Sequence, residues 1–190
     1  MWRGQGDIEW PLHSTGYRRL MMKDAFISGS GTPTEEDMRW FEKGVLKAAD
    51  HKGYRFHNGR RLSDLELLAL MRHHGAATRL LDFSRSLLVG LWFCSGFEFD
   101  RIGILVVIHA HYIGGYEGEP EDREYDSVMD AIKNLSHPMT WEPSPNSPRV
   151  SAQHSQIVYS RVSQSKMGSL DLPDGEDQTI FIAITPKLKS

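Results

Sequence analysis

The sequence predicts a mixed α+β domain, with helices concentrated in the first half of the chain and strands in the second. Two segments, 34–49 and 63–73, repeat apolar residues at helical spacing behind residues that cap helices. Later, 102–109 is an almost continuous apolar run, which is typical of a strand covered on both faces, and 153–162 alternates polar and apolar residues. With 190 residues, the chain is expected to form a single domain, 1–190, whose core needs no disulfide bonds.

The first half of the chain is expected to form one short strand and several helices. A strand is predicted at 2–6, where two glycines end it. Helix starts are predicted at Thr34, which precedes three acidic residues, and at Ser63, which forms a capping-box pattern with Glu66. The helices are expected at 17–26, 34–49, 63–73 and 86–97, with a loop at 53–61 and an extended segment at 78–83.

The second half is expected to supply most of the sheet. Its predicted elements are a strand at 102–109, a loop at 112–122, a short helix at 126–135, and strands at 153–162 and 179–184. The segment 137–148 holds four prolines, and because proline cannot donate a backbone hydrogen bond we expect no regular structure there.

Composition excludes several classes of protein. A single cysteine, Cys94, permits no intrachain disulfide, which is typical of a protein of the reducing cytoplasm, and no zinc-binding spacing or other metal site is expected. No apolar run approaches the ~18 residues of a membrane span, and the start lacks a signal-peptide pattern, so we expect no membrane partner. A net charge of -3 disfavours a dedicated duplex-DNA binder, but leaves a nucleic acid open as a substrate.

The most informative segment is 73–84, which lies between two predicted helices and is both apolar and rich in hydrogen-bonding groups. Its candidate ligand-binding residues are Thr78, Arg79, Asp82 and Ser84. In a strand, the two hydroxyls and the carboxylate share one face, and Ser84 is also placed to cap the following helix, whose N–H groups attract anions. The alternative is a buried turn whose polar groups satisfy one another, with Arg79 and Asp82 as a structural ion pair.

Arg3, the paired histidines and Gln153 are further candidates. Arg3 lies on the predicted first strand beside glycines that let a ligand approach the backbone, and arginine suits phosphate or carboxylate, although a solvated arginine is the simpler interpretation. His73 and His74 are about 100° apart on a helix, so only one of them can face a given ligand. Gln153 and Ser155 project together in a strand, where an amide can hold a ribose hydroxyl; the alternative is a hydrophilic strand end.

Three ordered blocks of the sequence resemble the FRG domain family. The blocks are 2–5 with 10–12 and 17–19, similar to the aromatic-Arg-Gly opening; 68–84, similar to A-x-M-Q-H-x-G-x-P-T-R-L-L-D-W-T; and 149–155, similar to R-x-x-x-Q-x-G. The chain departs from these patterns with Arg72 in place of glutamine, Ala76-Ala77 in place of a residue and proline, and Ser155 in place of glycine.

FRG domains are similar in block order to ADP-ribosyltransferases, and this resemblance implies an ADP-ribosyltransferase-like split β-sheet core with NAD as the substrate. It implies that Arg3, with Gly4 and Gln5, holds the NAD phosphates or ribose. It also implies that a hydroxyl-bearing block binds the nicotinamide side of NAD, and that Gln153 takes the position of the catalytic residue on a late strand. The residues of that hydroxyl-bearing block are Thr78, Arg79, Asp82 and Ser84. Because an amide cannot act as a base, His74, His154 or the acceptor itself must take the proton.

The resemblance therefore implies an NAD-dependent ADP-ribosyltransferase that modifies a protein or nucleic acid, acts as a bacterial toxin or phage–host conflict protein, and has an inhibitor protein as a further partner. One alternative is a non-catalytic nucleotide-binding sensor module, which Gln153 in place of an acid favours. Another is a metal-independent RNase that uses a pair of histidines.

Overall fold

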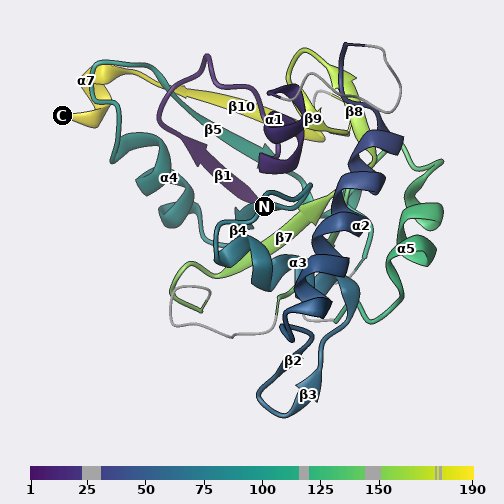
Figure 1. The fold of residues 1–190 in the computed structure, drawn as a ribbon. Coiled ribbons are helices and arrows are strands. Elements are labelled where there is room, and N and C mark those ends of the chain that lie inside the picture. The colour runs from purple at the N-terminus through teal and green to yellow at the C-terminus, as the bar shows by residue number, and fades with distance from the viewer. Residues whose placement is uncertain (23–30, 116–119, 144–150, 174, 176) are drawn as a thin grey trace.

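The computed structural model describes residues 1–22, 31–115, 120–143, 151–173, 175 and 177–190. Its centre is a six-stranded antiparallel sheet with the strand order β10-β5-β1-β4-β7-β6 (Figure 1). The strands are β1 (Trp2–Gln5), β4 (Leu81–Ser84), β5 (Gly103–Ile108), β6 (Met139–Trp141), β7 (Ser155–Tyr159) and β10 (Thr179–Ile184). The predicted α+β class is confirmed.

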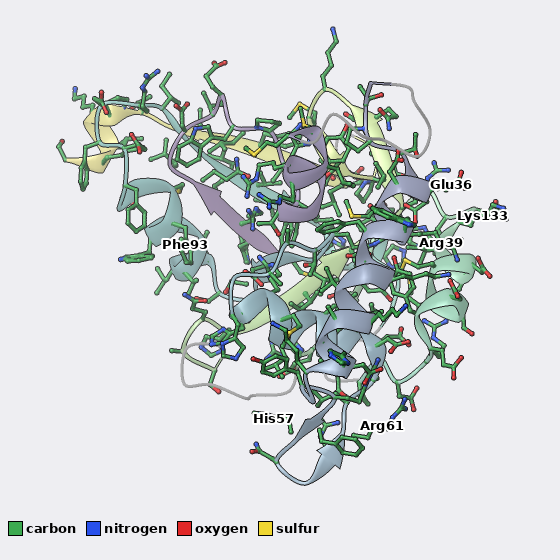
Figure 2. All side chains as sticks on the ribbon, in the orientation of Figure 1. Glu36, Arg39, His57, Arg61, Phe93 and Lys133 are labelled. Carbon is green, nitrogen blue, oxygen red and sulfur yellow. The ribbon has the colours of Figure 1, made fainter. Side chains whose placement is uncertain are left out.

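The helices divide into two groups around this sheet. They are α1 (Thr15–Met21), α2 (Glu35–His51), α3 (Asp64–His73), α4 (Leu87–Ser95), α5 (Tyr125–Ile132) and α7 (Pro186–Lys189), with a 3-10 turn at Ala110–Tyr112. Helix α4 packs against β1, β4 and β5, whereas α2 packs against α1 and α3 (Figure 1). Arg39 of α2 forms ion pairs with Asp126 and Asp130 of α5 (Figure 2).

The two predicted helix starts are confirmed in detail. The side chain of Thr34 accepts a hydrogen bond from the backbone N–H of Asp37, whose side chain in turn accepts from the backbone of Thr34. Ser63 and Glu66 form the same reciprocal capping box at the start of α3. Because these contacts join residues three apart in the chain, the local sequence suffices to predict them.

The main core lies between α2, α3, α5 and strands β6 and β7. It includes Leu46, Leu65, Leu68, Val128 and Tyr159, all buried. Strand β5 is buried along nearly its whole length, which confirms that its continuous apolar run reflects cover on both faces. None of the helices in the described segments has the length and apolar character needed to span a bilayer.

Two predictions of irregular structure are wrong. Within 137–148, Met139–Trp141 forms β6, which pairs with β7 at one end of the strand order and makes an isolated bridge to Gly114. The prolines at 138 and 143 flank the strand rather than interrupt it, and 144–148 lie outside the described residues. The expected loop at 53–61 contains a small hairpin, β2 (Phe56–His57) and β3 (Arg60–Arg61), which projects from the body of the molecule (Figure 1). Its turn is Asn58-Gly59, both at positive φ, a strong hairpin signal.

The predicted strand at 153–162 is divided in two. His154 adopts a φ of 45°, so the chain turns just before β7, and β8 (Val162–Ser165) then pairs with β9 (Gly168–Leu170) in a separate small sheet. The predicted helix at 17–26 corresponds to α1, which begins at Thr15, and its last part, 23–26, lies outside the described residues.

Gly4 allows β1 and α4 to approach closely. A Cβ at Gly4 would overlap the carbonyl oxygen of Gly90 and the backbone nitrogen of Cys94, both in α4. Helix backbone therefore fills the space on the Cβ side of this glycine, while Gly4 also lines a cavity between β1, β4 and α4. The close packing holds the strand that carries Arg3 in a fixed position beside the helix.

Candidate functional site

Two cavities meet beside the centre of the sheet, and we call them the first and second chambers of one cleft. The first chamber, of about 200 Å³, lies between β1, β4 and α4. The second, of about 220 Å³, lies beside the end of α3 and the start of β7. Four residues line both chambers, namely Arg72, Asp82, Gln153 and Ser155. The chambers are therefore continuous at these four side chains.

The sheet brings the three sequence blocks together. In the sheet register, Trp2 of β1 lies opposite Ser84 of β4, and Ser84 lies opposite Ser155 of β7. The hydroxyl of Ser84 donates to the carbonyl oxygen of Gln153 at 2.7 Å, and its oxygen accepts from the backbone N–H of Ser86 at 2.9 Å. This serine therefore ties the turn that carries Gln153 to the residue that precedes α4.

Arg3 extends from β1 into the first chamber. Its Nη1 donates to the main-chain oxygen of Asp82 at 2.7 Å, and its guanidinium lies 6.0 Å from the centre of the Phe83 ring. Burial lowers the pKa of Arg3 from 12.5 to about 10; the Asp82 carboxylate opposes this effect, and the neighbouring cations Arg72 and Arg18 add to it. Positive charge in this region is thus incompletely balanced, which favours an anionic ligand.

Asp82 and Arg72 form an ion pair between β4 and the last turn of α3. The side chain of Asp82 is 52% exposed, whereas that of Arg72 is 16% exposed. Because both residues line both chambers, the pair lies where the chambers meet. Sequence reasoning missed Arg72, since a basic residue in the last turn of a helix is an ordinary feature of helix C-termini.

Arg79 lies in a separate, closed network. Its backbone N–H and its Nε each donate to Glu42 at 2.6 Å, its Nη1 donates to Glu35 at 2.8 Å, and its Nη2 donates to the hydroxyl of Tyr125 at 3.0 Å. The Tyr125 hydroxyl donates to Glu42 at 2.7 Å. The ion pair of Arg79 with Asp82, considered from the sequence, is therefore wrong.

Burial and charge in this network act in opposite directions. Burial alone would lower the pKa of Arg79, but Glu42, Tyr125 and Glu35 outweigh it and hold that pKa well above its usual value. Burial, the charge of Glu42 and their hydrogen bond raise the pKa of Tyr125 far above its ordinary value, although Arg79 opposes them. The network keeps the Arg79 guanidinium charged inside the protein, which is a structural role.

Several other predicted site residues lie away from the cleft. Thr78 is fully buried, and its Oγ1 accepts from the backbone N–H of Leu80 at 3.3 Å. Gln5 is also buried, and its Nε2 donates to the carbonyl oxygen of Trp10 at 2.7 Å. Neither residue lines either chamber.

The two adjacent histidines differ in position. His73, the last residue of α3, lines the second chamber, while His74, the residue that follows the helix, lines neither chamber. Their ring centres are 5.6 Å apart with the rings nearly perpendicular. The structure therefore brings His73, and not the predicted His74, to the cleft.

The cleft offers aromatic rings and charge but no metal cluster. Trp2, Phe83 and Phe93 line the first chamber, with Phe93 supplied by α4 (Figure 2). Across the part of the chain that the structure describes, no group of three histidine, cysteine or acidic side chains is arranged to hold a metal ion. Two arginines, one carboxylate, an amide and aromatic faces suit a ligand that combines phosphate with aromatic rings.

The fold and the site define an α+β domain with a cationic, aromatic-lined ligand cleft. A family model for the FRG domain matches residues 1–100, and the chain belongs to the FRG domain family. The matched part contains Arg3, Arg72 and Asp82, whereas Gln153 and Ser155 lie beyond it. No curated protein and no solved structure matches the chain.

Proposed function

We propose that the cleft binds NAD and that the protein is an ADP-ribosyltransferase-like enzyme. The observation that carries this proposal is the convergence of three distant blocks on one cleft. Arg3 from β1, Asp82 from β4 and Gln153 from the turn before β7 all border the first chamber. These are the three positions that the block order of ADP-ribosyltransferases assigns to NAD binding and to catalysis.

Each group has a chemical task in this proposal. The guanidinium of Arg3 binds the diphosphate, and the aromatic rings of Phe83 and Phe93 stack on the nicotinamide or adenine. The amide of Gln153 both donates to and accepts from ribose hydroxyls. These contacts position the ribose and stabilise the charge that it develops.

The reaction is a substitution at C1′ of the ribose. The bond between C1′ and the nicotinamide nitrogen breaks, its electron pair leaves with neutral nicotinamide, and the ribosyl group becomes an oxocarbenium ion. A nucleophile of the acceptor forms the new bond to C1′ and loses its proton to a base. His73, which lines the second chamber, and the acceptor itself are the candidates for that base.

The direct test compares the wild type with Arg3→Ala and Gln153→Ala. We expect calorimetry to give about tenfold weaker NAD binding for Arg3→Ala, because charge-assisted hydrogen bonds to phosphate are lost. Nicotinamide release should fall for both variants, and an acceptor protein or nucleic acid should gain the mass of one ADP-ribose. If a toxin role is correct, expression should harm bacteria and Arg3→Ala should relieve that harm. Arg161→Ala, which breaks an ion pair with Asp171 outside the cleft, is the control.

Unchanged nicotinamide release in both cleft variants would contradict the assignment of the site. Binding without release, and without any acceptor modification, would favour the second candidate, a non-catalytic nucleotide sensor. Two observations support that candidate: an amide, Gln153, borders the cleft where an acid would be needed, and Arg72 neutralises Asp82. The RNase alternative needs two histidines at one site, and among the described residues only His73 lines the cleft.

A further inference from the structure

The Arg72–Asp82 ion pair lies where the two chambers of the cleft meet. Both side chains line the first and the second chamber, so the pair lies between them. Asp82 is also the only acidic residue that lines either chamber among the residues that the structure describes. A ligand that extends from one chamber into the other must therefore pass this pair.

The exposure of the Arg72–Asp82 ion pair favours exchange of the carboxylate for an anionic ligand. Asp82 is more than half exposed, and an ion pair open to water is weak because solvent screens it. A diphosphate offers Arg72 two oxygens in the bidentate geometry that guanidinium groups prefer. Arg3 would keep its position during such an exchange, because it is held by the main-chain oxygen of Asp82 and not by the carboxylate.

We propose that an anionic diphosphate binds between the chambers, takes Arg72 from Asp82, and thereby frees the Asp82 carboxylate to act in catalysis. The ligand is a dinucleotide with one half in each chamber and its diphosphate at Arg72 and Arg3. This inference rests on the function proposed above and names the residue that supplies the missing negative charge.

The freed carboxylate supplies the negative charge that Gln153 lacks. An amide can hold a ribose hydroxyl, but it carries no charge to stabilise an oxocarbenium ion. Asp82 lines the same two chambers as Gln153. It forms no covalent bond in this scheme; its negative charge lowers the energy of the cation while the electron pair leaves with nicotinamide. Without ligand, Arg72 keeps this charge neutralised.

The decisive variant is Asp82→Asn, which removes the competitor for Arg72 and keeps the main-chain oxygen that binds Arg3. We expect its affinity for ADP-ribose, measured by calorimetry, to rise about fivefold, since the ligand no longer displaces a carboxylate. The rate of nicotinamide release at saturating NAD should fall about a hundredfold. A structural role for Asp82 would not raise affinity and lower turnover together.

Arg72→Gln separates partner exchange from a simple change of charge. It should weaken binding of ADP-ribose and of inorganic pyrophosphate about tenfold. In the double variant Arg72→Gln/Asp82→Asn, the rise in affinity caused by Asp82→Asn should disappear, because there is no longer an arginine for which the carboxylate and the ligand compete. Arg161→Gln and Asp171→Asn remove the matching charges of an ion pair outside the cleft and should change neither binding nor release.

Each result has one meaning. If Asp82→Asn raises affinity equally with and without Arg72, the effect is general electrostatics and the exchange is wrong. If Arg72→Gln binds ADP-ribose as the wild type does, the exchange is wrong while NAD binding stands. If Asp82→Asn releases nicotinamide at the wild-type rate, the catalytic assignment of Asp82 is wrong. If pyrophosphate binding depends on Arg72 but NAD does not bind, the exchange stands and the proposed enzyme function fails. If neither binds, both fail.

Discussion

Arg79 and Arg72 lie seven residues apart in the sequence and occupy opposite kinds of environment. The side chain of Arg79 is 3% exposed and its partner Glu42 is fully buried, with Tyr125 completing the network. Arg72 is paired with a carboxylate that is 52% exposed and borders open space. An arginine–carboxylate ion pair thus forms part of a closed, buried network at Arg79, whereas at Arg72 it borders a cavity, where we propose that a ligand binds.

The two regions also differ in charge balance. Arg79 contacts two carboxylates, Glu42 and Glu35, so its positive charge is more than compensated. The cleft places Arg3 and Arg72 beside Asp82 alone among the acidic residues that line it within the described segments. We therefore expect substitutions in the Arg79 network to change stability, and substitutions in the cleft to change binding.

The largest effect should come from Arg79→Met. This change leaves the buried Glu42 carboxyl group without its cation, and breaking a buried pair in this way costs about 3–5 kcal/mol. Urea unfolding followed by circular dichroism measures the loss, and Arg79→Lys, which keeps the charge, should lose less. A loss below about 1 kcal/mol would remove the distinction between the two regions.

Tyr125→Phe removes a single hydroxyl group from the same network and should have a smaller effect. The hydroxyl accepts from Arg79 and donates to Glu42, so its removal leaves two buried groups short of one hydrogen bond each. We expect a decrease of about 1–3 kcal/mol in the free energy of unfolding. A change within the error of the urea midpoint would mean that water or another group replaces the hydroxyl.

Arg3→Met should have a smaller effect on stability, in contrast to its effect on NAD binding. Arg3 is half-buried and has a 2.7 Å hydrogen bond to a main-chain oxygen, so its loss should cost about 1 kcal/mol. Thermal unfolding with and without NAD measures both properties in one experiment. A loss as large as that of Arg79→Met would make Arg3 a structural residue.

Asp82→Asn should have the smallest effect on unfolding, within about 0.5 kcal/mol, because exposed ion pairs contribute little. Asp171→Asn, which breaks the exposed pair with Arg161, gives the matched comparison. A loss of several kcal/mol for Asp82→Asn alone would show that the ion pair supports the fold, and would contradict its exchange with a ligand.

The elements that the sequence predicts well are those defined by local contacts. The helix start at Thr34, the Ser63–Glu66 capping box and the strand at 179–184 occur as expected, because short spacings and a run of β-branched residues specify them locally. Strand β6 was missed since its three residues become a strand by pairing with residues distant in the chain, in β7 and at Gly114. The β2–β3 hairpin was predictable from Asn58-Gly59 alone.

The candidate site was partly predictable for the same reason. Arg3, Asp82, Ser84 and Gln153 were expected together, and all line the first chamber. The position of Arg79 was not predictable, because nothing in its block indicates that Glu42, on a helix far earlier in the chain, saturates it. Arg72 was missed because its contact with Asp82 depends on how the end of α3 packs against β4, which the local sequence does not show.

The strand order has a consequence for when the cleft forms during synthesis. Strand β1 is synthesised before the other strands of the sheet, yet its four residues pair mainly with β5, about a hundred residues later. Gln153 and Ser155 complete the cleft later still. Such distant pairing makes folding slow, because a long loop must close, with a loss of chain entropy, before the contacts can stabilise it. During synthesis the cleft is therefore incomplete until the chain has been made as far as Ser155.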